Sequence, residues 1–264
     1  MDRIMRLIVC LIGLIGALAA LPASAEDPVS EDWQFQVAPY VWALAADGNA
    51  TVKGQKSDVS LSFKDIVEEL NYGVMLQGEA RKGRVGAFAN VLYANLGDET
   101  DVGPLKIDPE ANLFMGGFSG YYRLGPWDLD GEAGDDSPQL IVDPYAGVRY
   151  TYLDLDLDIS GGPSLGNDQD WFEPIVGLRT LWELSPRWGV TAAGDIGGFG
   201  VGSDFAWQAI GLVSYRFGLF GENNSRFLFG YRALHQDYSN GSGANKFEWD
   251  VTLHGPIFAL AVEF

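Results

Sequence analysis

The chain has 264 residues, of which 47% are hydrophobic, 13% aromatic and 20% charged, and this composition excludes a disordered or collagen-like chain. Acidic residues outnumber basic ones by 36 to 17, and the formal net charge of −19 argues against a nucleic-acid partner, because phosphate binding requires a basic face. After residue 25 no apolar run reaches about eighteen residues, which excludes membrane-spanning helices.

The first 25 residues predict a cleaved secretory signal peptide. Arg3 and Arg6 form a positive start, residues 7–21 are an apolar stretch, and Ala23-Ser24-Ala25 is a small-residue cleavage site. The only cysteine, Cys10, lies in this segment, so residues 26–264 have no thiol for a disulfide, a metal site or a nucleophile. A signal peptide followed by a cysteine-free chain is typical of a bacterial envelope protein.

From Trp33 onward, apolar and polar residues alternate with the period of strands rather than of helices. Clusters of glycine, proline, asparagine and aspartate separate ten such runs. The runs are residues 33–44, 72–81, 85–96, 112–124, 139–157, 171–182, 188–197, 204–217, 226–238 and 247–264. Short turns, such as Lys82-Gly83 and Ser185-Pro186, interleave with longer polar loops, such as residues 45–71 and 158–170, an asymmetry typical of outer-membrane barrels.

We therefore predict an all-β fold, a transmembrane up-and-down antiparallel β-barrel of about ten strands, with eight or twelve as alternatives, formed by residues 26–264. Inside a bilayer every backbone N–H and C=O must be paired, so only helices and closed barrels can span it. In the first long loop, Phe63, Ile66, Val67 and Leu70 share one face of a predicted short helix over residues 63–70. This helix either narrows the barrel mouth or caps the barrel without a gating role.

The last run carries a further signal. Phe258, Leu260, Val262 and Phe264 share one face, and small or polar side chains alternate with them, as expected for a strand between lipid and lumen. An aromatic carboxy-terminal residue with this alternation looks like the signal read by the outer-membrane assembly machinery. The alternative is an ordinary amphipathic final strand.

Several stretches resemble an uncharacterised family of bacterial outer-membrane β-barrel proteins. They are residues 38–42 (APYVW), 63–66 (FKDI), 79–83 (EARKG), 194–200 (GDIGGFG), 207–208 (WQ), 230–232 (GYR) and 250–256 (DVTLHGP). The resemblance spans nearly the whole chain after the signal peptide. It implies a barrel in the bacterial outer membrane, with outer-membrane lipid, lipopolysaccharide and the assembly machinery as expected partners, and it carries no established activity.

Strand alternation also predicts the lumen-facing side chains. Placing the large apolar residues outward puts Gln77, Glu79, Arg81, Arg123, Arg149, Arg179, Asp195, Gln208, Arg216, Arg232 and Glu263 inward. Buried arginines need carboxylate partners, so we expect a salt-bridged, largely filled lumen and a structural or interaction role. The alternative is a constriction for small polar solutes built from Glu79, Arg81, Arg149, Arg179, Asp195, Arg216 and Arg232, which would favour anions because arginines outnumber acids.

We expect no cofactor and no metal site. The candidate metal ligands are Asp154, Asp156 and Asp158, which alternate along one strand face and offer the oxygen ligands that Ca²⁺ and Mg²⁺ prefer. A solvated strand extension explains the same three residues. Residues 198–202 (GFGVG) superficially look like a phosphate loop, but no helix follows them, so we predict a tight hairpin.

We also expect no enzymatic activity. His235 and Asp237 share a strand face near the predicted outer rim, and an Asp/His pair there would be the machinery of a hydrolase acting on lipid or peptide. A serine nucleophile of the barrel lipid A deacylase type fits less well, because three residues rather than one separate His235 from Ser239. The alternative is that His235 and His254 are interfacial side chains.

Overall fold

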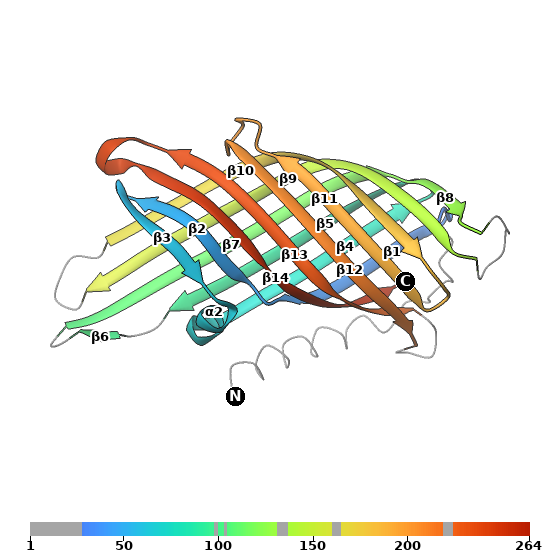
Figure 1. Ribbon diagram of the computed structural model, residues 1–264, viewed down its shortest axis with the longest axis horizontal. Coiled ribbons are helices and arrows are strands. Elements are labelled where there is room, and N and C mark those ends of the chain that lie inside the picture. The colour runs from blue at the N-terminus through green and yellow to red at the C-terminus, as the bar shows by residue number, and fades with distance from the viewer. Residues whose placement is uncertain (1–27, 98–99, 103–104, 131–136, 160–164, 219–223) are drawn as a thin grey trace.

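Ten strands form a closed antiparallel barrel in the computed structural model, which describes residues 28–97, 100–102, 105–130, 137–159, 165–218 and 224–264 (Figure 1). Around the ring the strands are β1 (Trp33–Trp42), β4 (Leu70–Lys82), β5 (Val85–Gly97), β7 (Leu105–Tyr122), β9 (Gln139–Ile159), β10 (Leu165–Glu183), β11 (Trp188–Gly197), β12 (Phe205–Phe217), β13 (Ser225–Asn240) and β14 (Phe247–Glu263). Pairing of β14 with β1 closes the ring and confirms the predicted fold. The predicted signal peptide lies outside the described residues.

The seam of the barrel has two strands on one edge of β14. Residues near the end of β14 pair with β1, from Gln36 opposite Glu263 to Trp42 opposite Ile257, while its first half pairs with β2 (Ala45–Val52). The chain then turns back at Lys53 and Gly54 into β3 (Gln55–Leu61), which pairs with β2. The prediction of a loop over residues 45–71 was therefore wrong. Both turn residues have positive φ, as a two-residue hairpin turn of type I′ requires, and β14 extends beyond β1 and offers β2 a free ladder edge.

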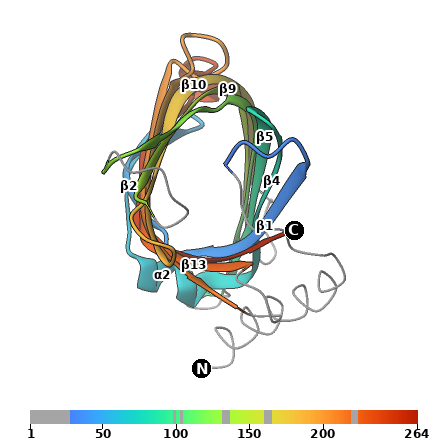
Figure 2. The same cartoon turned by 90° about the vertical axis from the view of Figure 1, so that its right-hand side faces the viewer.

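The predicted short helix is present as α2 (Phe63–Glu69), one residue shorter than expected. It begins at a capping box, in which the Ser62 hydroxyl accepts from the Asp65 amide and the Asp65 carboxylate accepts from the Ser62 amide. Hydrogen bonds from the Ser62 hydroxyl and amide hold the pKa of Asp65 below its usual value. Seen from the end, α2 lies at the wall and not across the opening (Figure 2). Among the described residues, no helix is long and apolar enough to cross a membrane.

Several strands are longer than the sequence predicts. β7 begins at Leu105 and β10 at Leu165, whereas alternation places their starts at residues 112 and 171. Two short strands, β6 (Thr100–Val102) and β8 (Leu124–Asp128), pair with β7 and β9. Outside the bilayer a strand meets water on both faces, so its hydrogen-bond ladder continues where the hydrophobic alternation has ended.

The two ends of the barrel differ. The start of β1 and the end of β14 lie at the end with short connections, such as Gly83 between β4 and β5 and residues 184–187 between β10 and β11; we call this the turn end. The opposite end, the loop end, carries the β2–β3 hairpin, the β13–β14 connection with its short 3₁₀ helix (Gly243–Asn245), and residues 198–204, whose three glycines have positive φ and form the predicted tight turn. Short turns face the periplasm in outer-membrane barrels.

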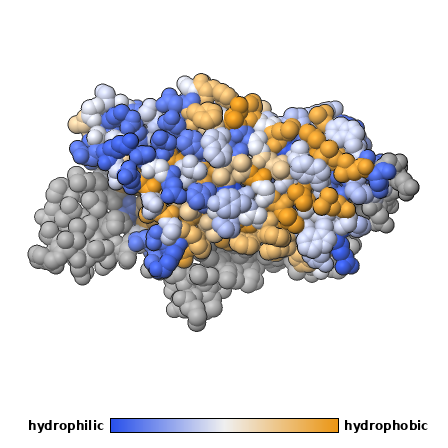
Figure 3. Space-filling model, viewed as in Figure 1, coloured by the Kyte–Doolittle hydropathy of each residue, from blue (hydrophilic) through white to orange (hydrophobic). Residues whose placement is uncertain are grey.

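The polarity of the barrel is inverted relative to a water-soluble protein. On β10, Val176 and Leu178 are each 47% exposed, whereas Glu173 and Arg179, on the other face, are 0% and 9% exposed. The same inversion runs around the ring, with exposed Phe118, Val148, Phe172, Ile196, Phe229 and Phe258. On the face shown in Figure 3, apolar side chains gather over the middle of the strands and polar ones at the loop end. Such a band in water would cause aggregation, but in hydrocarbon it is favourable.

Gly255 lies where the pairing partner of β14 changes from β2 to β1. We predict that Gly255→Ala destabilises the barrel. Its φ is 153°, and a Cβ on this residue would lie 1.9 Å from the carbonyl oxygen of Ala43, between β1 and β2. We expect a loss of about 1–3 kcal/mol in unfolding free energy, the usual cost of overpacking, measured by urea unfolding in lipid vesicles followed by tryptophan fluorescence. Gly211→Ala is the matched control, because a Cβ there meets nothing within 4 Å. Equal losses in both variants would contradict the explanation.

Candidate functional site in the barrel lumen

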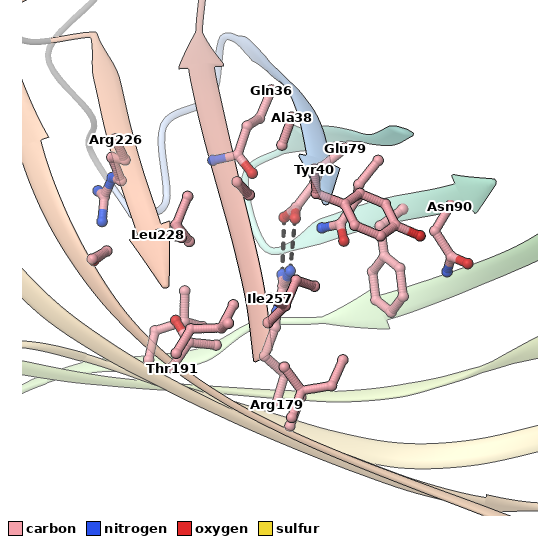
Figure 4. Close-up of a pocket in the computed structure, with 18 of the residues that line it drawn as sticks. Gln36, Ala38, Tyr40, Glu79, Asn90, Arg179, Thr191, Arg226, Leu228 and Ile257 are labelled. Atoms are coloured by element: carbon pink, nitrogen blue, oxygen red, sulfur yellow. Dashed lines mark hydrogen bonds and ion pairs between the residues drawn. The ribbon is translucent and has the colours of Figure 1, made fainter. Parts of the chain in front are cut away.

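Arg179 of β10 crosses the lumen and binds two carboxylates. Its Nη1 and Nη2 donate to Glu79 of β4 at 2.6 and 2.9 Å, and its Nε and Nη2 donate to Asp143 of β9 at 3.1 and 2.8 Å. The ring centroids of Phe88 and Tyr121 lie 5.3 and 4.7 Å from the guanidinium carbon. Figure 4 shows Arg179 reaching Glu79 from the opposite wall. Two carboxylates and two aromatic faces therefore compensate one buried guanidinium.

Asp143 also holds Arg123, which links this cluster to the turn end. Arg123 donates Nε to one oxygen of Asp143 at 3.0 Å and Nη2 to the other at 2.9 Å. Its Nη1 donates to the carbonyl oxygen of Pro28 at 3.2 Å, and Arg81 donates to the same oxygen at 2.8 Å. The chain just upstream of β1 is thus tied to two lumen arginines.

A second cluster is built around Arg149 of β9. Its Nη1 donates to Glu173 at 3.2 Å and its Nη2 to Asp195 at 2.7 Å. Each carboxylate has both oxygens paired, because neutral donors bind the positions that Arg149 leaves open. Those donors are the side chains of Trp171 and Gln236 on Glu173, and of Tyr145 and Gln208 on Asp195. This pairing meets the requirement that buried charges be fully hydrogen-bonded.

At the turn end, Arg226 of β13 joins two further strands. It lies 2.6 Å from Glu183 of β10 and 2.9 Å from Glu263 of β14. Arg216 lines a neighbouring recess of about 90 Å³ together with Pro28 and Glu183.

The structure places all the lumen residues expected from alternation on the inner side of the wall. Glu79 meets Arg179, and Arg149 meets Asp195, and Arg81 and Arg216 lie nearer the turn end. Sequence reasoning missed the acids Asp143, Glu173 and Glu183. The same alternation contains them, because Asp143 has the parity of Arg149 on β9, and Glu173 and Glu183 that of Arg179 on β10.

A cavity of about 190 Å³ lies beside the Glu79–Arg179 pair, in the half of the lumen nearer the turn end (Figure 4). One side is polar and includes Glu79, Asn90 and Arg179. The wall from β12 to β14 is mainly apolar there, with Ile210, Leu212, Leu228, Ile257 and Ala259.

The proposed catalytic pair lies on the outer face of the barrel. The His235 ring stacks on Trp207 with centroids 6.1 Å apart, and its Nδ1 lies 3.1 Å from the Thr252 hydroxyl. Within the described part of the chain, no hydrogen bond joins His235 to Asp237. His254, also on the outer face, contacts Tyr231 at 2.7 Å and Asp47 at 2.8 Å.

Of the three candidate metal ligands, the structure describes the side chain of Asp154. Asp154 is half-buried on the outward parity of Tyr150, and the side chains of Asp156 and Asp158 lie outside the described residues. Among the residues that the structure describes, no group of three or more histidine, cysteine, aspartate or glutamate side chains could hold a metal ion.

A closed hydrogen-bond ladder, an apolar outer band and a charged interior together decide the class of fold. The chain is an outer-membrane β-barrel. This fold implies the bacterial outer membrane as its location. No family model matches the chain, and no curated protein matches it.

Solved structures of outer-membrane proteins resemble the barrel distantly. Ail, the attachment invasion locus protein of Yersinia pestis, has 9% identity and a TM-score of 0.35, over 89% of this chain and 99% of that one. Neisserial surface protein A has 14% identity and a TM-score of 0.33, over 88% and 97%. A FadL homologue of Pseudomonas aeruginosa has 10% identity and a TM-score of 0.29, over 88% and 89%. These structural similarities do not indicate a function for this chain.

We predict that Arg179→Met destabilises the barrel strongly, by about 3–5 kcal/mol, because it leaves Glu79 and part of Asp143 buried without their counter-charge. Adding Glu79→Gln to Arg179→Met should recover part of the loss, since one uncompensated carboxylate is then neutral. Urea unfolding in lipid vesicles measures both. Lys64→Gln, which breaks the exposed Lys64–Glu68 pair on α2, is the control and should leave stability unchanged. A double variant no more stable than the single one would refute the pairing argument.

Proposed function

We propose that this protein is a non-enzymatic, closed barrel of the outer membrane with a structural or interaction role and a lumen that does not conduct. The observation that carries the proposal is an apolar cluster that fills the lumen toward the loop end. Its buried members include Trp42, Leu92, Met115, Leu234 and Val251, each at most 3% exposed.

This cluster joins opposite sides of the wall. Met115 lies on β7 and Leu234 on β13, and these strands stand five places apart in either direction around the ring. A second cluster, nearer the loop end, contains Leu153 of β9 and Phe247 of β14, which are also opposite strands. The stacked rings of Trp171 and Tyr238, with centroids 4.4 Å apart, belong to the same cluster. An ion crossing these layers would have to displace closely packed side chains, and the hydrogen bonds of Glu173 and Gln236 beside them are already made within the protein.

The alternative function is a narrow pore for small polar or anionic solutes. The arginines that line the turn-side cavity support it, because positive side chains favour anions. For conduction, both apolar clusters would have to open.

Three placements support the non-enzymatic part of the proposal. His235 contacts Thr252 and is stacked on Trp207, its strand face points to the outside of the barrel, and the carboxylate within 4 Å of its ring among the described residues is that of Asp250, at 3.9 Å, and not that of Asp237. A hydrolase acting on lipid or peptide would lose activity on His235→Ala, whereas we expect no hydrolysis above background from the wild-type protein.

We predict that the refolded protein gives no current steps in a planar lipid bilayer. Trp42→Ala and Leu234→Ala in the first apolar cluster, combined with Tyr238→Ala and Phe247→Ala in the second, should produce discrete steps, because both clusters then lose large buried side chains. Phe229→Ala, on the outer face, is the control and should stay silent. A heat-dependent gel shift confirms folding in each case. Steps from the wild type whose ion preference changes in Arg179→Glu would establish the pore instead.

We also propose outer-membrane lipid and lipopolysaccharide as partners of the apolar band, and the assembly machinery as the reader of the last strand. Two observations support recognition of the last strand by the assembly machinery. The backbone of Phe264 pairs with that of Phe35 at the seam, at 2.8 and 2.9 Å, and Phe258 on the same face is 47% exposed.

Deleting Phe264 should therefore reduce the amount of barrel in the outer membrane of cells severalfold, while the purified variant still refolds in detergent. The comparison of cellular yield with refolding yield distinguishes a lost recognition signal from a lost contact. Parallel losses in both would contradict a signalling role.

A further inference from the structure

Arg232 of β13 is a buried cation without an acidic partner. It is 6% exposed, and its Nε and Nη2 both donate to one oxygen of Gln208, at 2.9 and 2.6 Å. The ring of Trp42 lies 4.4 Å from its guanidinium carbon. In the part of the chain that the structure describes, no carboxylate lies within 4 Å of Arg232. Four other lumen arginines do have such a partner, namely Arg123, Arg149, Arg179 and Arg226.

Gln208 separates Arg232 from the carboxylate of Asp195. The amide nitrogen of Gln208 donates to Asp195 at 2.9 Å, and its oxygen accepts from Arg232. Asp195 meanwhile binds Arg149 at 2.7 Å. The negative charge of Asp195 is therefore matched by Arg149, and the partners of Arg232 are neutral groups, namely the Gln208 oxygen, the Trp42 ring and the Tyr40 hydroxyl.

The unmatched charge lines the 190 Å³ cavity. Five arginines and two glutamates are the charged side chains among the described residues that line this cavity. Three of these arginines, Arg123, Arg179 and Arg226, also bind Asp143 or Glu183 behind the lining, whereas Arg232 has no carboxylate partner within the described residues. Leaving a guanidinium buried without a counter-charge is costly. An anion in the cavity would remove that cost, and the apolar wall of Ile210, Leu212, Leu228 and Ile257 beside it suits a ligand with a hydrocarbon body.

We propose that this cavity binds a small organic monocarboxylate, with its carboxylate on Arg232 and its hydrocarbon body against the wall of β12–β14. An apolar cavity of about 150 Å³ is large enough for benzene, so a cavity of about 190 Å³ accepts a ligand of the size of benzoate. The lining continues from Arg232 to Gln34 and Glu263 near the turn end, which makes the periplasm the side of entry. Binding there does not require the lumen to conduct, so the inference goes beyond the proposed function.

The test uses benzoate and benzamide, which share a shape and differ in charge. Isothermal titration of the refolded full-length barrel in detergent should give saturable binding of one benzoate, with benzamide at least tenfold weaker. Arg232→Gln should weaken benzoate at least tenfold, the scale of one lost charge-assisted hydrogen bond. Arg187→Gln is the matched control, because it removes an arginine from the exposed β10–β11 turn and should leave benzoate affinity unchanged.

Leu228→Trp provides a second variant in case Arg232→Gln does not fold. It keeps Arg232 and fills the cavity, so it should also abolish benzoate binding. The proposal is overturned if benzoate does not bind the wild type, if benzamide binds equally well, or if a folded Arg232→Gln or Leu228→Trp retains full affinity. Inorganic phosphate binding as tightly as benzoate would overturn the organic class of the ligand.

Discussion

The ion pairs of Arg179 are the interactions on which the arrangement of the barrel interior depends. The side chain reaches from β10 to Glu79 on β4 across the lumen and to Asp143 on the neighbouring strand β9. Because hydrocarbon surrounds the wall, these charges find their partners inside the lumen. The position of Asp143 in turn fixes Arg123, and through Arg123 the segment at Pro28. One guanidinium thus couples opposite walls of the barrel and the start of the described chain.

Much of this arrangement can be predicted from sequence, because a bilayer permits few alternatives. The alternation of apolar and polar residues in the strands of Arg149 and Arg179 predicts which side chains face the lumen. The requirement that every backbone group in a bilayer be paired predicts a closed barrel. The β2–β3 hairpin could not be predicted in this way, because its residues meet water and do not alternate, and its position depends on the length of β14. Alternation also identifies which residues face inward without identifying their partners. Strand register decides that Arg149 pairs with Glu173 and Asp195. It also decides that Arg232 has no carboxylate within 4 Å among the described residues.

The strand register also explains why residues far apart along the barrel wall meet in the lumen. Starting at Glu79, directly paired residues lead through Phe88 and Ser119 and around the ring to Val251 on β14. The strand beside Glu79, β1, pairs instead with Glu263 of β14, through Gln36. The sheet therefore closes with a shift from residue 263 to residue 251, and its strands are steeply tilted. A tilted wall brings side chains from distant positions along the strands to one level of the lumen.

The two halves of the lumen consequently differ. Toward the loop end the side chains are packed as in a soluble protein core, with Leu234 fully buried and with Glu173 and Gln236 of the Arg149 cluster hydrogen-bonded among them. Toward the turn end they are charged and leave a cavity.

The seam between β1 and β14 has a kinetic consequence. The side chains of Gln36 and Glu263, which are hydrogen-bonded across it, are 227 positions apart in sequence. Contacts of such long range form late and slowly, so the growing sheet keeps two unpaired edges until the final strand arrives. During that interval the edges of β1 and β14 are templates for foreign strands, and the time to closure sets how long the chain needs protection from aggregation.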